Sequence, residues 1–524
     1  MTKRYFMMAV LLAATTIAMG QNTYLNDQLT ATDDIDGTAR YVGMGGAMGA
    51  LGADLSVISS NPAGIGLYRK NDIGLTFGAV VPNKAGGWNS DDSRAYGEKL
   101  ARASFDQAGI VWSIKTGGKK LKFVNFAFNY QKKANYNMGF YADNLALDGL
   151  SQMDQVADLA NAGYDSDYNL AGLAYDNGYL TEQEIGQAQK YIYNNYGGER
   201  GYYTRHQRGS LQAYDFNVSF NVNDRFYTGL TIGADNMNYL SWSSYYEQSQ
   251  DDQGNYGDYD LYNDREIDGH GVNVKWGFIV RPVETSPFRI GLAIETPTWY
   301  RIKSSTLYDL TDAENIRTDT KESYLETTIR TPWRARLSMG STVDKILAWG
   351  VEYEFANASK TRMGYPSDGY YDSYRSTEDK AMTQLTKNTL RGQHTLKLGL
   401  EIKPTDALAL RVGYNFVSSR YKKNPTFDQY QIDSYAMNYQ TSTDYMTLGA
   451  ANIVTFGLGY KYKKFYADLA YKYRAQGAKF YAFDTGFTEG DFGADFPELK
   501  GATIEPVDLD LNRHQLMLSL GFKF

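Results

Sequence analysis

Along much of this chain, apolar and polar residues alternate one by one, as they do on the two faces of a β-strand. In the last such stretch, one face carries Leu516, Leu518, Leu520, Phe522 and Phe524, and the other carries Gln515, Met517, Ser519, Gly521 and Lys523. The strands of a soluble β-sandwich also alternate between apolar and polar residues. Here, however, the polar face is rich in glycine and charge while the apolar face ends in aromatics, which is typical of a transmembrane barrel with its apolar side outward.

The connections between these stretches support the same architecture. Strands are predicted near 72–82, 105–116, 121–131, 210–222, 225–241, 270–282, 287–303, 323–341, 346–360, 390–403, 407–421, 451–462, 465–475 and 509–524. The gaps alternate between short turns, such as Asn223-Asp224, and long loops, such as 132–209 and 242–269. Short turns at one rim and long loops at the other are the outer-membrane pattern. We therefore expect an all-β fold, a transmembrane antiparallel β-barrel of about 14 strands over residues 72–524.

The first 20 residues have the features of a secretory signal peptide. Lys3 and Arg4 precede an apolar run, and Ala18-Met19-Gly20 is a small-residue cleavage site before Gln21. The run is too short for a membrane anchor. Later in the chain, no stretch of apolar residues is long enough for a transmembrane helix. Export to the outer membrane is the predicted localisation.

Composition excludes several functional classes. The chain has no cysteine and four scattered histidines, so neither a metal site nor a cofactor is expected. Its net charge of −7 becomes −9 when the leader with its two basic residues is lost, and an acidic exported protein is a poor nucleic-acid partner. We expect it to contact outer-membrane lipid. The terminal Phe524 resembles the signal read by the barrel assembly machinery, which is a second expected partner.

The long loops are polar and rich in tyrosine. Helices are predicted at 151–161 and at 181–196, the second because Thr181 and Glu184 form a capping box. The third loop holds seven acidic residues, Asp251, Asp252, Asp258, Asp260, Asp264, Glu266 and Asp268. They lack the ligand spacing of a calcium loop, so a solvated loop is the favoured interpretation. Charges on inner strand faces (Arg334, Arg336, Arg411, Asp468 and Lys472) are expected to line a solvated wall.

Between the leader and the barrel lies a glycine-rich segment, Gly43 to Leu67, that suits neither a helix nor a strand. A dinucleotide loop would need a preceding strand and a following helix, and neither is predicted. No Gly-x-Ser-x-Gly or His-Glu-x-x-His motif is present, so an enzyme is not expected. At the mouth of a barrel, such a segment can plug the lumen, act as a gate or extend away from the barrel.

Several motifs resemble the FadL/TodX family of outer-membrane transport proteins for hydrophobic compounds. The resemblance rests chiefly on Thr38-Ala39-Arg40, Gly43-Met44-Gly45-Gly46-Ala47 and Asn61-Pro62-Ala63-Gly64, which match the family's N-terminal hatch. Weaker matches lie at 331–337, 396–401, 410–414 and 513–522. Together they span the whole mature chain.

The resemblance implies that residues 21–71 form a hatch, or plug, inside the lumen. Loops would capture a hydrophobic small molecule, which leaves through the wall when the hatch shifts. The expected ligand or gate residues are Gly43, Gly45, Gly46, Leu55, Ile58, Asn61, Pro62, Ala63 and Gly64. Glycines allow an irregular path, and Asn61 can bond its own backbone. The resemblance does not decide between a hatch that opens and one that only seals the lumen.

Two functions follow as alternatives. The first is a channel for passive uptake of hydrophobic molecules such as long-chain fatty acids or aromatic hydrocarbons. The second is a similar barrel that acts as a surface scaffold or carrier for secreted proteins, because tyrosine-rich loops suit protein contacts as well.

Overall fold

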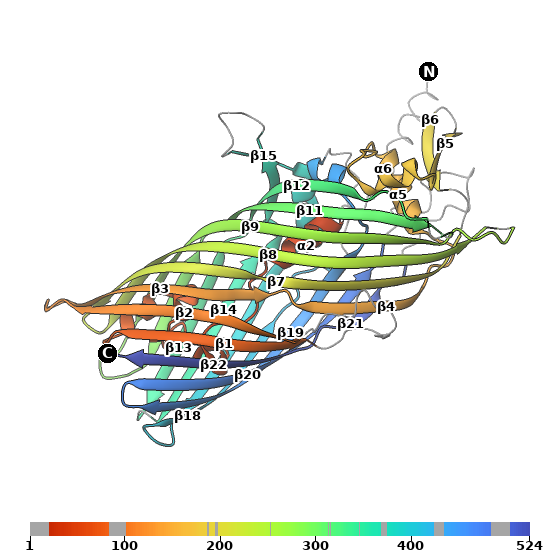
Figure 1. Ribbon diagram of the computed structural model, residues 1–524. Helices are drawn as coiled ribbons and strands as arrows, with labels where there is room; N and C mark the ends of the chain where they lie inside the picture. The colour runs from red at the N-terminus through yellow and green to blue at the C-terminus, as the bar shows by residue number, and fades with distance from the viewer. Residues whose placement is uncertain are drawn as a thin grey trace.

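The computed structural model describes residues 20–82, 101–185, 188–193, 197–251, 253–312, 314, 316–344, 346–367, 375–423, 434–483 and 504–524. These residues form a closed antiparallel barrel of 14 strands, as predicted (Figure 1). The leader falls on residues outside the described part, apart from Gly20, which begins the first described helix.

The barrel is built from strands that alternate in direction around the ring. They are β1 (Asp72–Pro82), β2 (Arg102–Lys115), β3 (Leu121–Asn135), β7 (Gly197–Val222), β8 (Phe226–Gln250), β9 (Tyr259–Val280), β10 (Arg289–Glu295) continued by β11 (Trp299–Asp312), β12 (Lys321–Arg330) continued by β13 (Arg334–Val343), β14 (Leu347–Asn357), β17 (Gly392–Ile402), β18 (Leu408–Val417), β19 (Tyr445–Tyr462), β20 (Phe465–Tyr481) and β22 (Arg513–Lys523). The ring closes where β1 pairs with β22, from Asp72 opposite Lys523 to Pro82 opposite Arg513.

The two faces of the wall have the predicted polarity. On β22, Leu516, Leu518 and Leu520 are 42–49% exposed on the outside, whereas Gln515 and Ser519 are buried on the inside. An apolar outer surface with polar residues inside makes this a transmembrane barrel. None of the helices in the described ranges is long and apolar enough to cross a membrane.

Two predicted strands are each broken in two. The stretch predicted at 287–303 is interrupted between Glu295 and Trp299, and the one at 323–341 between Arg330 and Arg334. The breaks contain Pro297 and Pro332. Proline has no N–H for the ladder, so it is tolerated in sheets only at ends and bulges.

The loop predictions were partly wrong. The helix predicted at 151–161 is α5 (Gln152–Asn161), but 181–196 contains a hairpin, β5 (Leu180–Ile185) and β6 (Ala188–Tyr193). Most of the loop predicted at 242–269 is hairpin too, because β8 runs to Gln250 and β9 starts at Tyr259. Tyrosine and isoleucine favour strands, and in these segments that preference prevails over the capping signal.

The remaining elements sit on the loop side of the wall. They are β4 (Met138–Ala146), α6 (Leu170–Asp176), η2 (Ala358–Lys360), β15 (Arg362–Pro366), β16 (Ser376–Glu378), α7 (Lys380–Thr389), η3 (Tyr435–Tyr439) and β21 (Val507–Asp510).

Candidate functional site

The N-terminal segment (residues 20–71) is a chain of short helices joined by turns. It comprises α2 (Gly20–Thr30), α3 (Ala39–Gly43), α4 (Val57–Ser60) and η1 (Pro62–Leu67). α3 begins where Thr38 Oγ1 accepts the N–H of Tyr41 at 3.1 Å. η1 begins at Pro62, which needs no N–H there, and Asn61 Oδ1 accepts the N–H of Ala63 at 3.2 Å. Asn61 thus makes the local bond expected of it, in an extended conformation with φ of −141°.

Glycines of the segment meet glycines of the wall. Gly45 and Gly46 have φ of 59° and 71° and form the turn after α3. A Cβ on Gly413 of β18 would lie only 2.2 Å from the Gly45 nitrogen, and one on Gly43 would lie 3.0 Å from Cα of Gly457 on β19. The backbone of the segment therefore packs directly on the backbone of the wall.

The second half of the segment makes the same kind of contact on other strands. Ser219 Oγ of β7 donates to Pro62 O at 2.8 Å, and Asn61 Nδ2 donates to Phe278 O of β9 at 3.3 Å. A Cβ on Gly277 of β9 would lie 2.1 Å from Asn61 Oδ1. The contact thus extends from β18 and β19 to β7, β9 and their neighbours.

All nine residues predicted for the hatch are therefore in one buried layer. Leu55 approaches Gly74 and Gly109, the carbonyl of Ile58 accepts from Thr231, Ala63 packs on Tyr227 and Ile279, and Gly64 leaves no room for a Cβ beside Val57. Sequence reasoning missed the wall side of this contact, the glycine belt formed by Gly74, Gly109, Gly229, Gly277, Gly291, Gly340, Gly350, Gly399, Gly413 and Gly457. Glycine repeated on the polar strand faces was the signal that could have revealed it.

A short acidic run between α2 and α3 is held by cations of the wall. Asp34 lies 2.9 Å from Lys472 Nζ, 3.6 Å from Arg474 and in contact with Arg513. Asp36 accepts from Gln515 at 2.9 Å, and Asp33 lies near Arg474 and Arg420. We call Asp33, Asp34 and Asp36 the acidic latch, because they attach the segment through side chains rather than through backbone.

Four of the five inner wall charges, Arg336, Arg411, Asp468 and Lys472, are buried, whereas the prediction placed them on a solvated wall. Arg411 donates to Glu401 at 2.6 Å and Asp468 at 2.5 Å. Arg336 bridges Glu295 and Glu354, each at 2.8 Å. The N-terminal segment covers these side chains, and burial requires charges to be paired. They therefore brace the wall and the segment.

A cavity of about 930 Å³, counting its open mouth, lies between α2 and the wall. Its apolar lining comes from Leu25, Leu29, Pro82, Ala134, Tyr136, Met138, Tyr239, Met446, Leu448 and Leu511. Its polar lining comes from the latch and its partners (Asp33, Asp34, Arg474 and Arg513) and from six further side chains, Gln28, Asn135, Asn137, Gln207, Gln476 and Asn512. Its lining thus combines an apolar surface with many polar side chains, and such a combination suits a small molecule that is mainly apolar and carries a polar group.

The wall beside this cavity is interrupted. Pairing of β2 with β3 ends at Gln107 opposite Gln131. Beyond that point β2 continues to Arg102 along β1, and β3 continues to Asn135 along β7. Lys132 Nζ lies 3.4 Å from Asp106 Oδ1 across the gap. Ala134 and Asn135, on the unpaired side of β3, also line the cavity.

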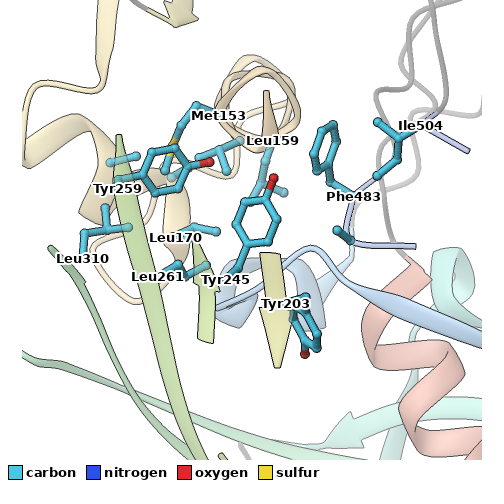
Figure 2. Close-up of a cluster of buried hydrophobic side chains, with 14 of the residues drawn as sticks. Met153, Leu159, Leu170, Tyr203, Tyr245, Tyr259, Leu261, Leu310, Phe483 and Ile504 are labelled. Atoms are coloured by element: carbon cyan, nitrogen blue, oxygen red, sulfur yellow. The ribbon is translucent and has the colours of Figure 1, made fainter. Parts of the chain in front are cut away.

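The long loops fold into a compact cap around a hydrophobic core. Met153, Leu159 and Leu170 converge with Tyr245 and Tyr259 from the wall (Figure 2). Many loop tyrosines thus belong to a buried core.

One carboxylate lies inside this cap, beyond the apolar band of the wall. Glu247 accepts from Ser151 Oγ at 2.5 Å, from the Gln152 N–H at 3.0 Å and from the hydroxyls of Tyr245 and Tyr259 at 2.8 and 2.9 Å. Burial raises its pKa to about 7, although the four donors oppose the shift.

The described residues include many acidic side chains, and carboxylates are ligands of metal ions. However, the described residues contain no group of three or more acidic or histidine side chains placed to hold a metal ion. The acidic residues predicted in the third loop are spread along the β8–β9 hairpin: Asp264, Glu266 and Asp268 alternate on the exposed face of β9, and Asp252 lies outside the described residues.

Comparison with solved structures finds similar barrels at low sequence identity. A Pseudomonas aeruginosa FadL homologue is 14% identical with a TM-score of 0.52, over 94% of this chain and 99% of that chain. The CymD monoaromatic hydrocarbon channel is 10% identical with a TM-score of 0.50, over 94% and 99%. A scan of protein-family models and a search of curated proteins found no match. The barrel fold that the motifs imply is thereby confirmed.

Proposed function

We propose that this protein is an outer-membrane channel for passive uptake of hydrophobic small molecules, with the N-terminal segment as its hatch. The observation that carries the proposal is the cavity, with its apolar surface, between α2 and the gap in the β2–β3 ladder. Apolar surface favours an apolar ligand by roughly 25 cal/mol per Å² buried. An opening in the wall gives that ligand a route into the bilayer without crossing the lumen.

The two halves of the hatch have different roles in this proposal. We call residues 20–38 the outer limb and residues 39–71 the inner limb. The inner limb, which holds Gly43, Gly45, Gly46, Leu55, Ile58, Asn61, Pro62, Ala63 and Gly64, seals the lumen against the glycine belt. The outer limb carries α2 and the acidic latch, borders the cavity and moves to admit the ligand.

The proposal also includes the localisation of the protein and the choice of substrates to test. The leader at 1–20 directs export, and Phe524 serves recognition by the assembly machinery. The backbone N–H and carbonyl of Phe524 both form hydrogen bonds with the backbone of Asn71, each at 3.1 Å. Aromatic hydrocarbons belong in the substrate panel, beside long-chain fatty acids, because one similar structure is described as a monoaromatic hydrocarbon channel.

Uptake into liposomes tests the channel. Folded protein is reconstituted, and entry of a panel of fatty acids and aromatic hydrocarbons is followed. We expect uptake of at least one class above protein-free liposomes. Absence of uptake for the whole panel would refute the channel function.

A reversible cross-link tests which limb moves. The chain has no cysteine, so L51C/G340C introduces one defined pair. A Cβ on Gly340 would lie 3.1 Å from Leu51 Cγ, which places the two Cβ atoms within reach of a disulfide. It would also lie 2.8 Å from Trp349 O, so the reduced double variant, which carries the same strain, is the reference for the oxidised one. We expect equal uptake by the oxidised and reduced protein, because the inner limb stays in place. Loss of uptake on oxidation, restored by reduction, would show instead that the inner limb opens.

The scaffold alternative makes a different prediction. Tyr203, Tyr245, Tyr259 and Tyr308 from the loop side are buried in the cap core, which leaves fewer tyrosines for a protein surface. A secreted protein captured from intact cells in stoichiometric amount, and lost on loop deletion, would favour the scaffold.

A further inference from the structure

A row of outward side chains crosses four neighbouring strands at one edge of the apolar band. The pairing register aligns Val272 of β9, Trp299 of β11, Arg330 of β12 and Arg362 of β15. Val272 and Trp299 are 54% and 45% exposed, and Arg330 and Arg362 are exposed as well. The row thus passes from an apolar residue through an aromatic one to two cations.

The two arginines are direct cross-strand neighbours, and like charges in that position repel each other. The Arg330 guanidinium lies 6.0 Å from the Trp299 ring centre. Arg362 lies 4.0 Å from Glu378, and both of these side chains are largely exposed. No carboxylate forms an ion pair with Arg330 within the described ranges of the chain. Exposed Lys360 adds a third cation nearby.

The surroundings of the pair place it at the membrane surface. On the membrane side, Ile294 and Leu337 are 43% and 48% exposed. On the loop side, Asp268 and Glu266 are exposed on β9, and Arg301 already pairs with Glu326. Trp299 and Trp333, the second 57% exposed, mark the interface between them, where tryptophan gathers.

We propose that Arg330 and Arg362, with Lys360, bind the phosphate group of a lipid in the surrounding leaflet. The phosphate bridges the two guanidinium groups and removes their repulsion, since arginine binds phosphate through paired hydrogen bonds. The acyl chains lie over Ile294 and Leu337, and Trp299 packs beside the head group. The site rests on the barrel spanning a membrane and is independent of what the channel carries.

Native mass spectrometry of the detergent-solubilised protein tests this site. The probes are bisphosphorylated lipid A, its fully dephosphorylated form and inorganic phosphate. R330Q/R362Q removes both charges and keeps most of each side chain. K119Q/K120Q is the matched control, because it removes two exposed cations at the opposite rim. Each cation near a membrane surface contributes about fivefold in affinity, so the test variant is expected to bind bisphosphorylated lipid about 30-fold more weakly.

The outcomes separate clearly once folding is verified by circular dichroism. Wild type and K119Q/K120Q should bind the phosphorylated lipid equally, and R330K/R362K should retain part of the binding. Equal binding by R330Q/R362Q, or equal binding of the dephosphorylated lipid to wild type, would overturn the proposal. So would displacement of the lipid by a modest excess of inorganic phosphate, because the site would then be a general anion site.

Discussion

Replacing Gly399 by alanine tests whether the N-terminal segment is sealed by backbone contact with the wall. A Cβ on Gly399 of β17 would lie 2.2 Å from the Met44 carbonyl oxygen and 3.0 Å from its carbon. Ordinary contact starts at 3.4 Å, so the Met44 peptide must move by about 1 Å. That carbonyl also accepts the Ala47 N–H at 3.1 Å, and the shift strains this bond.

The cost has two parts. Overpacking a rigid site costs about 1–3 kcal/mol, and loss of one hydrogen bond adds about 1 kcal/mol. The opening free energy of the segment should therefore fall by about 2–4 kcal/mol. Amide hydrogen exchange of residues 43–52, followed by mass spectrometry, should accelerate by roughly 30- to 1000-fold.

The control is G477A on β20, because a Cβ there meets nothing within 4 Å. It should leave exchange in 43–52 at the wild-type rate. Both variants should keep the circular dichroism spectrum of the barrel. Identical exchange in G399A and G477A would refute the reasoning, because the segment could then be only loosely placed against the wall.

Three further predictions concern the latch, the cap and the plug. D34N removes the carboxylate that Lys472 and Arg513 share, and Lys472 keeps only Asp36 at 3.3 Å as an acidic partner. Breaking a buried pair costs at most about 3–5 kcal/mol, so exchange should rise in residues 20–38 but not in 43–66; equal acceleration in both would contradict separate limbs. Glu247 has a pKa raised from 4.5 to about 7, so the stability it contributes to the cap is fully present below pH 4.5 and is lost as the pH rises through 7. The loss is about 3 kcal/mol and should appear as faster exchange in α5. E247Q should reduce this pH dependence without abolishing it, because burial also raises the pKa of Asp154 in α5, from 3.8 to about 6; an unchanged pH dependence in E247Q would exclude Glu247 as a source. Deletion of residues 43–64 should leave a folded barrel with a larger single-channel conductance, and unchanged conductance would mean that these residues do not fill the lumen.

The barrel could be predicted from the sequence because each strand shows its apolar and polar faces in its own local sequence. The alternation around Leu516 to Phe524 depends on two faces in two environments, and no distant contact is needed to recognise it. The ends of the strands were harder to predict. β8 and β9 continue beyond the apolar band as a polar hairpin, where alternation no longer separates lipid from lumen. The breaks at Pro297 and Pro332 were readable in principle, since proline interrupts a ladder.

The cap illustrates a different limit. Its core joins residues far apart in sequence, such as Met153, Leu310 and Phe483. Loop sequences carry little local record of such packing. The predicted helix at 181–196 failed for the same reason: a capping box is a local signal, and the Asn161 side chain instead bonds the backbone of Tyr191 at 2.8 Å in both directions.

The candidate site was half predicted. The hatch residues carry a motif, but the glycines opposite them, such as Gly413 and Gly457, are single residues in separate strands. Their meaning emerges only when the register places them around one layer. The acidic latch had the opposite problem: Asp33, Asp34 and Asp36 are obvious in the sequence, but their partners become identifiable only from the fold.

The two kinds of attachment bear on how the proposed channel could admit a ligand while the N-terminal segment stays bound to the wall. The inner limb rests on a belt of glycines that has no side chains to rearrange, so displacing it breaks many close contacts together. The outer limb is held by ion pairs at the edge of a cavity, and water or a ligand can replace these one at a time. Motion of the outer limb is therefore the less costly of the two. In the proposed function, movement of that limb beside Ala134 and Asn135 changes access to the wall gap while the lumen stays closed. The proposal therefore predicts that an apolar molecule leaves sideways without the barrel becoming leaky to ions.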